Sequence, residues 1–390
     1  MHDKAVSVSI VTSNSGRYVA RCLDAVFQQQ ETHLDVVVVD NASTDETRRI
    51  LAKYRSRIRL IKNDRNLGFA AAQNQAIRCS RSPWVLALNP DVLLQPDFMS
   101  NLLEAAAEAD PKAGTMCGKL LSIGPGFTPL PEARIDSTGI YFTPAMRHFD
   151  RGWQQPDDGR FDCPEYVFGA SAAAALYSRN LIDDISIDGE FFDPDFFAYR
   201  EDADIAWRAQ LLGWRCLYTP AAVGHHVRTV SPENRKSVSP IINMHSVKNR
   251  FLLRIKNLTP DLWRRYWLAM TVRDVAVVGG CLMTEQRSLE AFVRLAGCWR
   301  RAWERRRWIM KRRTVSEEEL AAWFHFESPA EGSSVQGTEA GDQQLRVLGN
   351  SGRIPPPERH DLPRALGRGF SNRQAVRASE PGSGMGLRAG

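Results

Sequence analysis

Two acidic segments of this chain have the residue types needed for metal binding and for proton transfer. In LNPDVLL, Asn89 and Asp91 follow an apolar run, and in FFAYREDADIAWR, Glu201, Asp202 and Asp204 open a helical pattern. One or two protein carboxylates suffice to hold a divalent cation when substrate and water supply the other ligands. Neighbouring carboxylates repel each other, which raises the pKa of one of them toward that of a general base. The segments therefore predict a cation at Asp91 and a base at Glu201 or Asp202.

Each of these segments also has a structural interpretation, which the sequence leaves open. Asn-Pro-Asp is common in turns, and acidic residues at a helix start interact favourably with the helix dipole. Asp204, two residues after Asp202, is expected to face elsewhere on the helix and to be mainly structural. His225 and His226 follow the strand-like segment RCLYTP. An imidazole there could complete a metal site, although an isolated His is more often structural.

Polar residues gather after two earlier segments as well. Asp40 ends the apolar run LDVVVVD, where its carboxylate could accept a hydrogen bond from the imide of a uracil or thymine base, or cap the next helix. The segment RNLGFAAAQNQAI brings Arg65, Asn66, Gly68 and Asn74 to a helix start. A helix start of this kind can bind phosphate or sugar hydroxyls. An equally good interpretation is a glycine turn that begins an Ala-rich packing helix.

The first half of the chain alternates short apolar runs with helical patterns, which predicts an α/β fold with a mostly parallel sheet covered by helices. We expect strands at residues 6–12, 34–40 and 58–63, and a fourth strand that ends in a turn within residues 84–94. Because open α/β sheets bind ligands at the carboxyl ends of their strands, the polar residues above are expected to meet there. Residues 124–165 predict a mixed strand-and-loop region over the site, followed by a helix at 201–212 and a short strand at 215–220.

Composition bounds the class of protein. With 390 residues, 43% of them hydrophobic, the chain can bury one domain of roughly 250 residues plus an appendage. Its seven cysteines are an odd number without C-x-x-C spacing, which argues against a disulfide framework or a zinc site and favours a reducing compartment. The N-terminus has no apolar stretch of signal-peptide length, and no run reaches the roughly 18 apolar residues of a membrane span.

The net charge of +6 is unevenly distributed. Residues 246–313 contain 17 Lys or Arg against 5 Asp or Glu, and they interleave Trp with Arg, as in WRRYWLAM and CWRRAWERRRWIMKRR. A helix of this kind is typical of the interface of an anionic membrane. Packing or oligomer helices are the alternative, whereas nucleic acid is not expected because the remaining, acidic part of the chain would repel it. We expect a catalytic domain at 1–245, a basic helical region at 246–326 and a disordered tail at 327–390.

Taken in order, these motifs resemble glycosyltransferase family 2 with the GT-A fold, over roughly residues 5–260, and within it the bacterial rhamnosyltransferase-like branch. The resemblance rests on SIVTSNSG, VVVVDNASTDET, RNLGFAAAQNQAI, LNPD, VFGASAAAALYSR, FFDPDFFAYREDADIAWR and the histidine pair. It implies a base at Asp202 tuned by Glu201, metal ligands at Asp91 and His226 or its neighbour, and a set of donor-binding residues. That set is Thr12, Asn14, Asp40, Asn41, Arg65, Asn66, Gly68, Asn74 and Asn89.

The resemblance also implies a reaction. It is the inverting transfer of a sugar, most simply rhamnose from dTDP-rhamnose, to a hydroxyl of a lipid-linked or cell-surface saccharide, with Mg²⁺ or Mn²⁺ at the donor diphosphate. The protein would act at the cytoplasmic face of the membrane as a peripheral protein, and it could form oligomers. Asn89 stands where the commoner family pattern has an acidic residue, which makes nucleotide binding a firmer expectation than metal dependence.

There are three alternatives to this reaction. A transferase of the same family could use a UDP-linked hexose instead. An inactive membrane-associated scaffold of the same fold would lose the base, yet Glu201 and Asp202 are both present. A sugar nucleotidyltransferase would need a glycine-rich, basic phosphate loop directly after the first strand, where this chain has TSNSGRYV.

Overall fold

The computed structural model describes residues 4–228 and 240–324. They belong to one compact unit that spans residues 1–337. The tail at 327–390, for which the sequence predicts disorder, lies outside the described residues.

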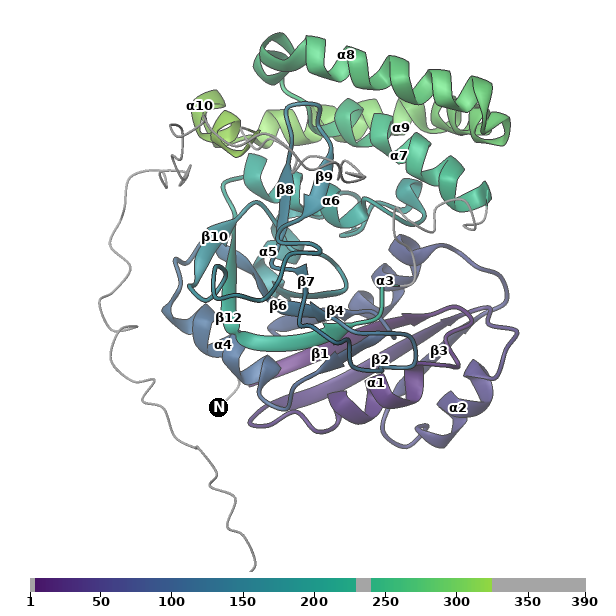
Figure 1. Cartoon of the computed structure of the whole chain (residues 1–390), viewed down its shortest axis with the longest axis vertical. Helices are drawn as coiled ribbons and strands as arrows, with labels where there is room; N and C mark the ends of the chain where they lie inside the picture. The colour runs from purple at the N-terminus through teal and green to yellow at the C-terminus, as the bar shows by residue number, and fades with distance from the viewer. Residues whose placement is uncertain (1–3, 229–239, 325–390) are drawn as a thin grey trace, which may run out of the picture. The chain divides into compact units, whose positions relative to one another are not determined.

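A mixed sheet forms the centre of the fold (Figure 1). Its parallel half contains β3, β2, β1 and β4 in that order. These strands span Ala5–Thr12 (β1), His33–Asn41 (β2), Arg59–Asn63 (β3) and Trp84–Leu88 (β4). The valines of β2 are buried on both faces of the sheet, as its continuous β-branched sequence predicts.

Helices cover both faces of the parallel half. On one face, Val6, Val8 and Ile10 of β1 pack with α1, α2 and α4, and on the other Val11 packs with α3. The alternation of β1 therefore separates two apolar clusters. The helices span Val19–Val26 (α1), Thr47–Lys53 (α2), Phe69–Arg78 (α3) and Phe98–Glu108 (α4).

The other half of the sheet is mostly antiparallel. The strand expected in residues 84–94 ends in a turn at Asn89, as predicted, and the short β5 that follows pairs with β12. One predicted strand differs from the structure. The strand expected at 215–220 extends to His226, past an irregularity between Thr219 and Val223. This half contains β5 (Val92–Leu94), β6 (Ala113–Ser122), β7 (Ile135–Ser137), β10 (Glu165–Val167), β11 (Ala174–Ser178) and β12 (Arg215–His226).

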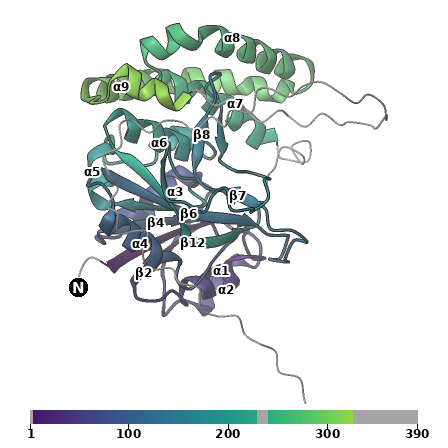
Figure 2. The ribbon, with the colours of Figure 1, turned by 60° about the vertical axis from the view of Figure 1, so that its left-hand side comes forward.

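Residues 124–165 form the expected mixture of loops and short strands. Within it, β8 (Ile140–Phe142) and β9 (His148–Asp150) pair as a separate antiparallel hairpin. In Figures 1 and 2 this hairpin extends from the sheet toward the C-terminal helices. It therefore connects the sheet side of the molecule with the helical side.

The second half of the described chain is helical. The helices are α5 (Arg179–Ile185), α6 (Glu201–Leu211), α7 (Pro240–Asn257), α8 (Pro260–Met283), α9 (Glu290–Arg312) and α10 (Glu317–Ala321). Short 3₁₀ turns lie at Pro194–Phe196, Gln286–Leu289 and Ala322–Phe324. Helices α7 and α9 pack against each other and against α6, whereas α8 lies outermost (Figures 1 and 2).

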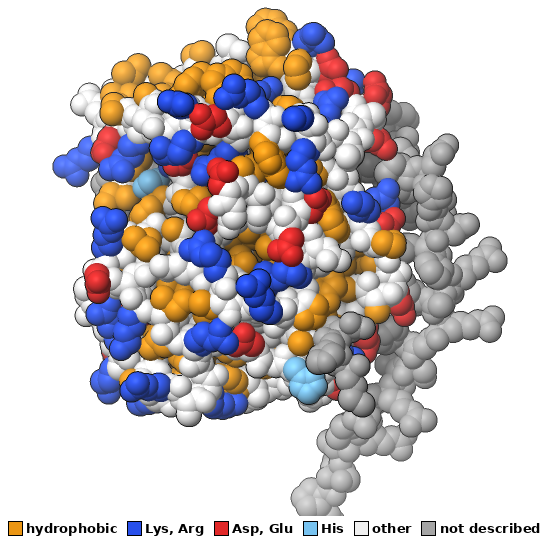
Figure 3. All heavy atoms as spheres, turned by 180° about the vertical axis from the view of Figure 1, so that it is seen from behind, with side chains coloured by type: hydrophobic (Ala, Val, Ile, Leu, Met, Phe, Trp, Pro, Cys, Tyr) orange, Lys and Arg blue, Asp and Glu red, His pale blue; other side chains and the backbone are white. Residues whose placement is uncertain are grey.

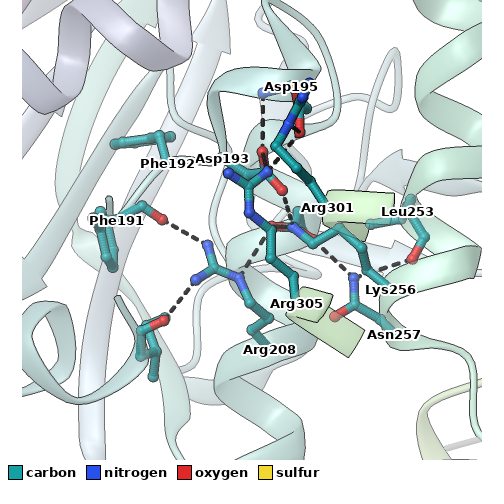
Figure 4. A network of polar contacts seen from close by, with 12 residues as sticks. Phe191, Phe192, Asp193, Asp195, Arg208, Leu253, Lys256, Asn257, Arg301 and Arg305 are labelled. Atoms are coloured by element: carbon teal, nitrogen blue, oxygen red, sulfur yellow. Dashed lines mark hydrogen bonds and ion pairs between the residues drawn. The ribbon is translucent and has the colours of Figure 1, made fainter. Parts of the chain in front are cut away.

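A buried polar network attaches α7 and α9 to α6 (Figure 4). The ammonium of Lys256 on α7 donates to Asp193 at 2.5 Å and to Asp204 on α6 at 2.7 Å. Asp204 also accepts from Arg208, and Arg305 of α9 donates to Asp193. Lys256 and Asp204 are completely buried. The structural role predicted for Asp204 is thus to anchor α6, which begins at the acidic cluster, to the helical layer.

Helix α8 exposes an apolar surface. Trp263, Trp267, Leu268, Val272 and Val275 are each at least half exposed. By length and composition α8 is the one helix among the described residues that could cross a membrane, a test that the core helices of soluble proteins also pass; 11% of its most apolar 18-residue window is buried. The sequence was expected to have no unbroken run of about 18 apolar residues, and Arg273 and Asp274 interrupt α8, which meets the test on mean hydropathy.

Candidate active site

A cavity of about 430 Å³ brings together the acidic residues singled out in the sequence. Five predicted site residues line it: Asn89, Asp91, Glu201, Asp202 and His226. They come from the turn after β4, the start of α6 and the end of β12. His148, Asp150, Arg200 and Arg228 line the same cavity, so that carboxylates and cations face a common space.

The Asp202 carboxylate is held by backbone amides at the start of α6. Its two oxygens accept from Ala203 N at 2.7 Å and from Ala172 N at 3.4 Å. Burial raises the pKa of Asp202 to about 6, with a further contribution from the negative charge of Asp150, against the lowering effect of the two amides. A carboxylate with this pKa is ionised at neutral pH and still basic enough to take a proton from a hydroxyl.

Glu201 differs from its neighbour. Burial, followed by the charge of Asp202, raises the pKa of Glu201 well above its usual value. Its Oε2 atom is buried without a hydrogen-bond partner among the described residues. Repulsion between the two buried carboxyls therefore disfavours the ionised form of Glu201 beside an ionised Asp202. This difference matches the base and tuning roles that the resemblance implies, and both roles remain predictions.

The turn that precedes α6 has an unusual backbone. Phe197, Tyr199 and Arg200 have φ values of 67°, 70° and 72°, in the left-handed region that non-glycine residues rarely adopt. Such residues cost about 1–3 kcal/mol each and persist only where the surroundings hold them. Here the side chain of Asn249 from α7 holds the turn. Its amide nitrogen lies 2.7–2.8 Å from the carbonyl oxygens of Phe196, Ala198 and Tyr199.

Replacing Asn249 by Ala should lower kcat about tenfold or more without a comparable change in donor affinity. The reason is that the strained turn loses its amide clamp, and a shift of about 1 Å in a catalytic group can cost 10²-fold in rate. Steady-state kinetics, with calorimetry for the donor, would check this. The control is Asn101→Ala, which removes a single exposed amide contact to Ala221 O. Equal kcat values for the two variants would contradict a positioning role for Asn249.

His226 is fixed by the residues on both sides of its ring. Nδ1 lies 2.7 Å from Asp136 Oδ2, and Nε2 faces Asp91 Oδ1 at 3.5 Å. Burial disfavours the charged ring, but the Asp136 and Asp91 carboxylates raise the pKa of His226 to about 10. A carboxylate on one ring nitrogen with the other nitrogen facing an open site is the usual arrangement around a metal-binding His. His225, the alternative ligand, does not line the cavity.

Asp91 Oδ1 and His226 Nε2, which face each other at 3.5 Å, could serve as two ligands of a divalent cation. Among residues 4–228 and 240–324 there is no group of three or more His, Cys, Asp or Glu residues that could hold one. The pair alone therefore leaves most coordination positions to substrate oxygens and water, as Mg²⁺ and Mn²⁺ sites at diphosphates do.

The predicted donor residues of β1, β2 and β3 form a second, contiguous polar group. Thr12 Oγ1 donates to Asp40 at 3.4 Å, and Arg48 Nε donates to the same carboxylate at 2.6 Å. Asn41 Nδ2 donates to Asn66 Oδ1 at 2.8 Å, and Asn14 Oδ1 accepts from Thr44 N at 2.8 Å. The group meets at the carboxyl ends of the strands as expected. Nucleoside binding there remains a prediction.

Gly68, Asn74 and Arg65 have different surroundings. Gly68 has a φ of 87°, and a Cβ there would lie 2.6 Å from Phe197 O, so only glycine fits against the turn before α6. Asn74 is buried, and its amide bonds both backbone groups of Phe192, at 2.6 and 2.9 Å. As placed, Asn74 supports the segment before the acidic cluster and does not line the cavity. Arg65 is exposed.

Sequence reasoning missed Asp136, Arg228 and Asn249. Arg228 donates to Asp136 at 2.8 Å and to Asp150 at 2.6 Å, and so fixes the carboxylate that orients His226. Asp136 lies in a region without periodicity, where no local signal separates it from other loop carboxylates. Arg228, two residues after His226, could have been found as a cation next to the predicted metal ligand.

The model of the family described as "Glycosyl transferase family 2" matches residues 7–185. This segment of the chain, somewhat less than half of it, belongs to glycosyl transferase family 2. An N-acetylglucosaminyl-diphospho-decaprenol L-rhamnosyltransferase of Mycobacterium tuberculosis is 28% identical over 239 residues, which cover 56% of this chain and 75% of that protein. This similarity supports the placement of the chain in the rhamnosyltransferase-like branch of family 2. A succinoglycan biosynthesis protein of Rhizobium meliloti is 34% identical over 110 residues, 27% of this chain and 32% of that protein.

Solved structures support the GT-A fold of this family 2 member. The structure of GalNAc-T7 with UDP, GalNAc and Mn²⁺ matches with a TM-score of 0.51 at 15% identity. The match covers 65% of this chain and 48% of that one, so the chain spans about half of that protein's length. As a member of family 2 the protein is a glycosyltransferase, which requires a sugar donor and an acceptor.

Proposed function

We propose that this family 2 member transfers rhamnose from dTDP-rhamnose, with inversion, to a hydroxyl of a lipid-linked saccharide. The observation that carries the proposal is the pairing, in one cavity, of a base-like Asp202 with the Asp91 and His226 pair. The transferred sugar and the acceptor class follow the name of the Mycobacterium tuberculosis relative, an N-acetylglucosaminyl-diphospho-decaprenol L-rhamnosyltransferase. The dTDP-linked donor follows the family resemblance of the sequence.

In the proposed reaction Asp202 accepts the proton of the acceptor hydroxyl as its oxygen attacks the anomeric carbon. The bond from that carbon to the donor phosphate breaks on the opposite face, so a single displacement inverts the configuration. Asp91 and His226 would hold a divalent cation, which neutralises charge on the departing diphosphate. The residues that end β1, β2 and β3 would hold the nucleoside, with Asp40 nearest the base.

The proposed donor can be tested with the purified full-length protein. Incubation with dTDP-rhamnose and a diphosphate-linked N-acetylglucosamine acceptor should yield dTDP and a rhamnosylated product of inverted anomeric configuration by NMR. EDTA should reduce the rate at least tenfold, and Mg²⁺ or Mn²⁺ should restore it. Turnover with a UDP-hexose and none with dTDP-rhamnose would replace the donor in the proposal. Retention of configuration would exclude the single displacement.

We also propose that α8 places the enzyme on the cytoplasmic face of an anionic membrane. Trp263 and Trp267 supply the amphipathic rings typical of such interfaces, and Leu268, Val272 and Val275 extend the exposed apolar surface. Figure 3 shows hydrophobic side chains along the edge formed by α8, with Lys and Arg side chains beside them. An exposed apolar surface flanked by cationic side chains is better suited to bind lipid than nucleic acid.

Replacing Leu268 and Val275 together by Glu should reduce binding to vesicles of mixed anionic and neutral phospholipid about tenfold or more. Two exposed apolar side chains would be lost from the interface and two negative charges gained opposite anionic headgroups. Vesicle flotation measures the effect. The exposed Leu130, outside the helical region, provides the control Leu130→Glu. Undiminished flotation of the double variant would refute docking through α8.

A further inference from the structure

Between the cavity and α8 lies a cluster of guanidinium groups that the proposed reaction does not use. We propose that it binds the diphosphate of the lipid-linked acceptor. The cluster consists of four arginines. Arg147 at the tip of the β8–β9 hairpin, Arg200 before α6 and Arg250 on α7 lie around His148, and Arg273 on α8 lies near Arg250. The inference rests on the proposed function for the identity of the acceptor, but the anion site itself can be tested separately.

Burial is the first reason to expect an anion here. The Nε atoms of Arg250 and Arg273 are both buried, and neither has a hydrogen-bond partner among the described residues. A buried N–H donor without a partner destabilises the fold. Two such donors on adjacent helices point to a ligand with several acceptor oxygens, and a diphosphate is such a ligand.

The second reason is that the charges here repel one another. Burial, followed by the positive charges of Arg273, Arg254 and Arg147, lowers the pKa of Arg250 to about 10. Burial and the charges of Arg200, Arg147 and Arg250 likewise keep the pKa of His148 well below its usual value. Like charges held together in this way are stabilised when an anion binds among them.

Two nearby arginines have their positive charge compensated by carboxylates. Arg228 pairs with Asp136 and Asp150, and Arg254 pairs with both oxygens of Asp274 at 2.7 and 2.8 Å. These guanidinium groups have carboxylate partners within the protein. Arg254 is one helical turn from Arg250 on α7. The two residues can therefore be compared directly, because Arg254 has a carboxylate partner and Arg250 makes no such hydrogen bond within the described part of the chain.

The position of the cluster fits the acceptor and not the donor. His148 and Arg200 line the cavity, and Arg200 is two residues from Asp202. His148 Nδ1 lies 3.0 Å from the Arg200 guanidinium. Arg273 belongs to α8, whose outer surface is apolar. An acceptor with its lipid at α8 and its diphosphate at the cluster would present its sugar to Asp202, while the donor diphosphate lies toward Asp91.

Inorganic pyrophosphate is the probe for the anion site alone. In EDTA, which removes the metal-dependent mode of binding, pyrophosphate should raise the Tm of the full-length protein. The shift should be lost in Arg250→Gln and retained in Arg254→Gln. Without pyrophosphate, Arg250→Gln should unfold at an equal or higher temperature than the wild type, since it removes an uncompensated charge. Equal pyrophosphate shifts in wild type and Arg250→Gln would overturn the site.

Kinetics then identify the source of the phosphate. With a short-chain diphosphate-linked acceptor, Arg250→Gln should raise the acceptor KM about tenfold to a hundredfold, leaving the donor KM unchanged. With an uncharged alkyl glycoside of the same sugar, wild type and variant should behave alike. An increase in donor KM instead, or a loss of flotation on anionic vesicles with the acceptor KM unchanged, would overturn the assignment to the acceptor. If no diphosphate-linked acceptor is used at all, the proposed function fails while the pyrophosphate shift still reports the site.

Discussion

Replacing Asp202 by Asn should lower kcat about 10²–10⁴-fold, the range that general bases contribute, and should leave donor binding nearly unchanged. The amide keeps the shape of the carboxylate and can still accept from Ala203 N, so the start of α6 should be preserved. What it loses is the ability to take the acceptor proton. Steady-state kinetics with calorimetry for the donor would separate the two effects.

The pH dependence of the wild type provides a second readout of the same residue. Because burial and Asp150 raise the pKa of Asp202 to about 6, the base is protonated below that pH. The logarithm of kcat/KM should therefore rise with unit slope up to about pH 6 and then level off. Near-normal turnover by Asp202→Asn, or a rate independent of pH between 5 and 7, would refute the assignment.

The raised pKa also makes a prediction about stability. The folded state binds the Asp202 proton more tightly than the unfolded state, so this carboxyl favours folding at low pH. That contribution is lost as the pH rises through about 6. Relative to wild type, Asp202→Asn should gain on the order of 2 kcal/mol in free energy of unfolding at pH 8 and much less at pH 4. Urea unfolding at both pH values would measure the difference.

Replacing Lys256 by Met should reduce the free energy of unfolding by about 3–5 kcal/mol, the largest stability effect that we expect from a single substitution in this chain. Met has a similar length and keeps the buried volume. Removing the ammonium, however, leaves Asp193 and Asp204 with one cation fewer in a site closed to water. Arg305 and Arg208 still compensate part of the charge.

Denaturant unfolding of the two proteins would measure this loss, and Lys4→Met is the matched control. Lys4 forms an ion pair with Glu31 in which both side chains are about half exposed or more, so its removal should change stability by less than about 1 kcal/mol. Similar losses for the two variants would show that the network does not depend on Lys256. Because Asp204 belongs to α6, Lys256→Met should also lower kcat under conditions in which the variant is still folded.

Local sequence was sufficient for the parallel half of the sheet and for the acidic site. The buried run of β2 and the polar residues that follow each strand are properties of short segments, so periodicity located them. The same holds for Glu201 and Asp202, because their position at a helix start is encoded within a few residues. The α/β fold with a mostly parallel sheet was expected on this basis, and the GT-A fold from the family resemblance; the sheet agrees with both.

Partners that are distant in sequence could not be predicted in this way. His226 faces Asp91 because β12 runs beside β5 and β6, a pairing of segments that are more than 100 residues apart. Asn74 bonds Phe192, across a separation of 118 residues. The arginines of α9 were expected to flank an apolar membrane-binding face, and the structure shows that Arg301 and Arg305 pair with Asp195, and Arg305 also with Asp193.

The sequence by itself thus determined the types of catalytic group and the strands that carry them. The tertiary structure decided which histidine faces Asp91, what holds the turn before α6, and that the buried Nε atoms of Arg250 and Arg273 have no partner among the described residues. The physical reason is that periodicity records only which side of a helix or strand is buried. The group that a buried side chain contacts depends on how remote segments pack. The same packing decides whether a buried charge has a partner of opposite charge.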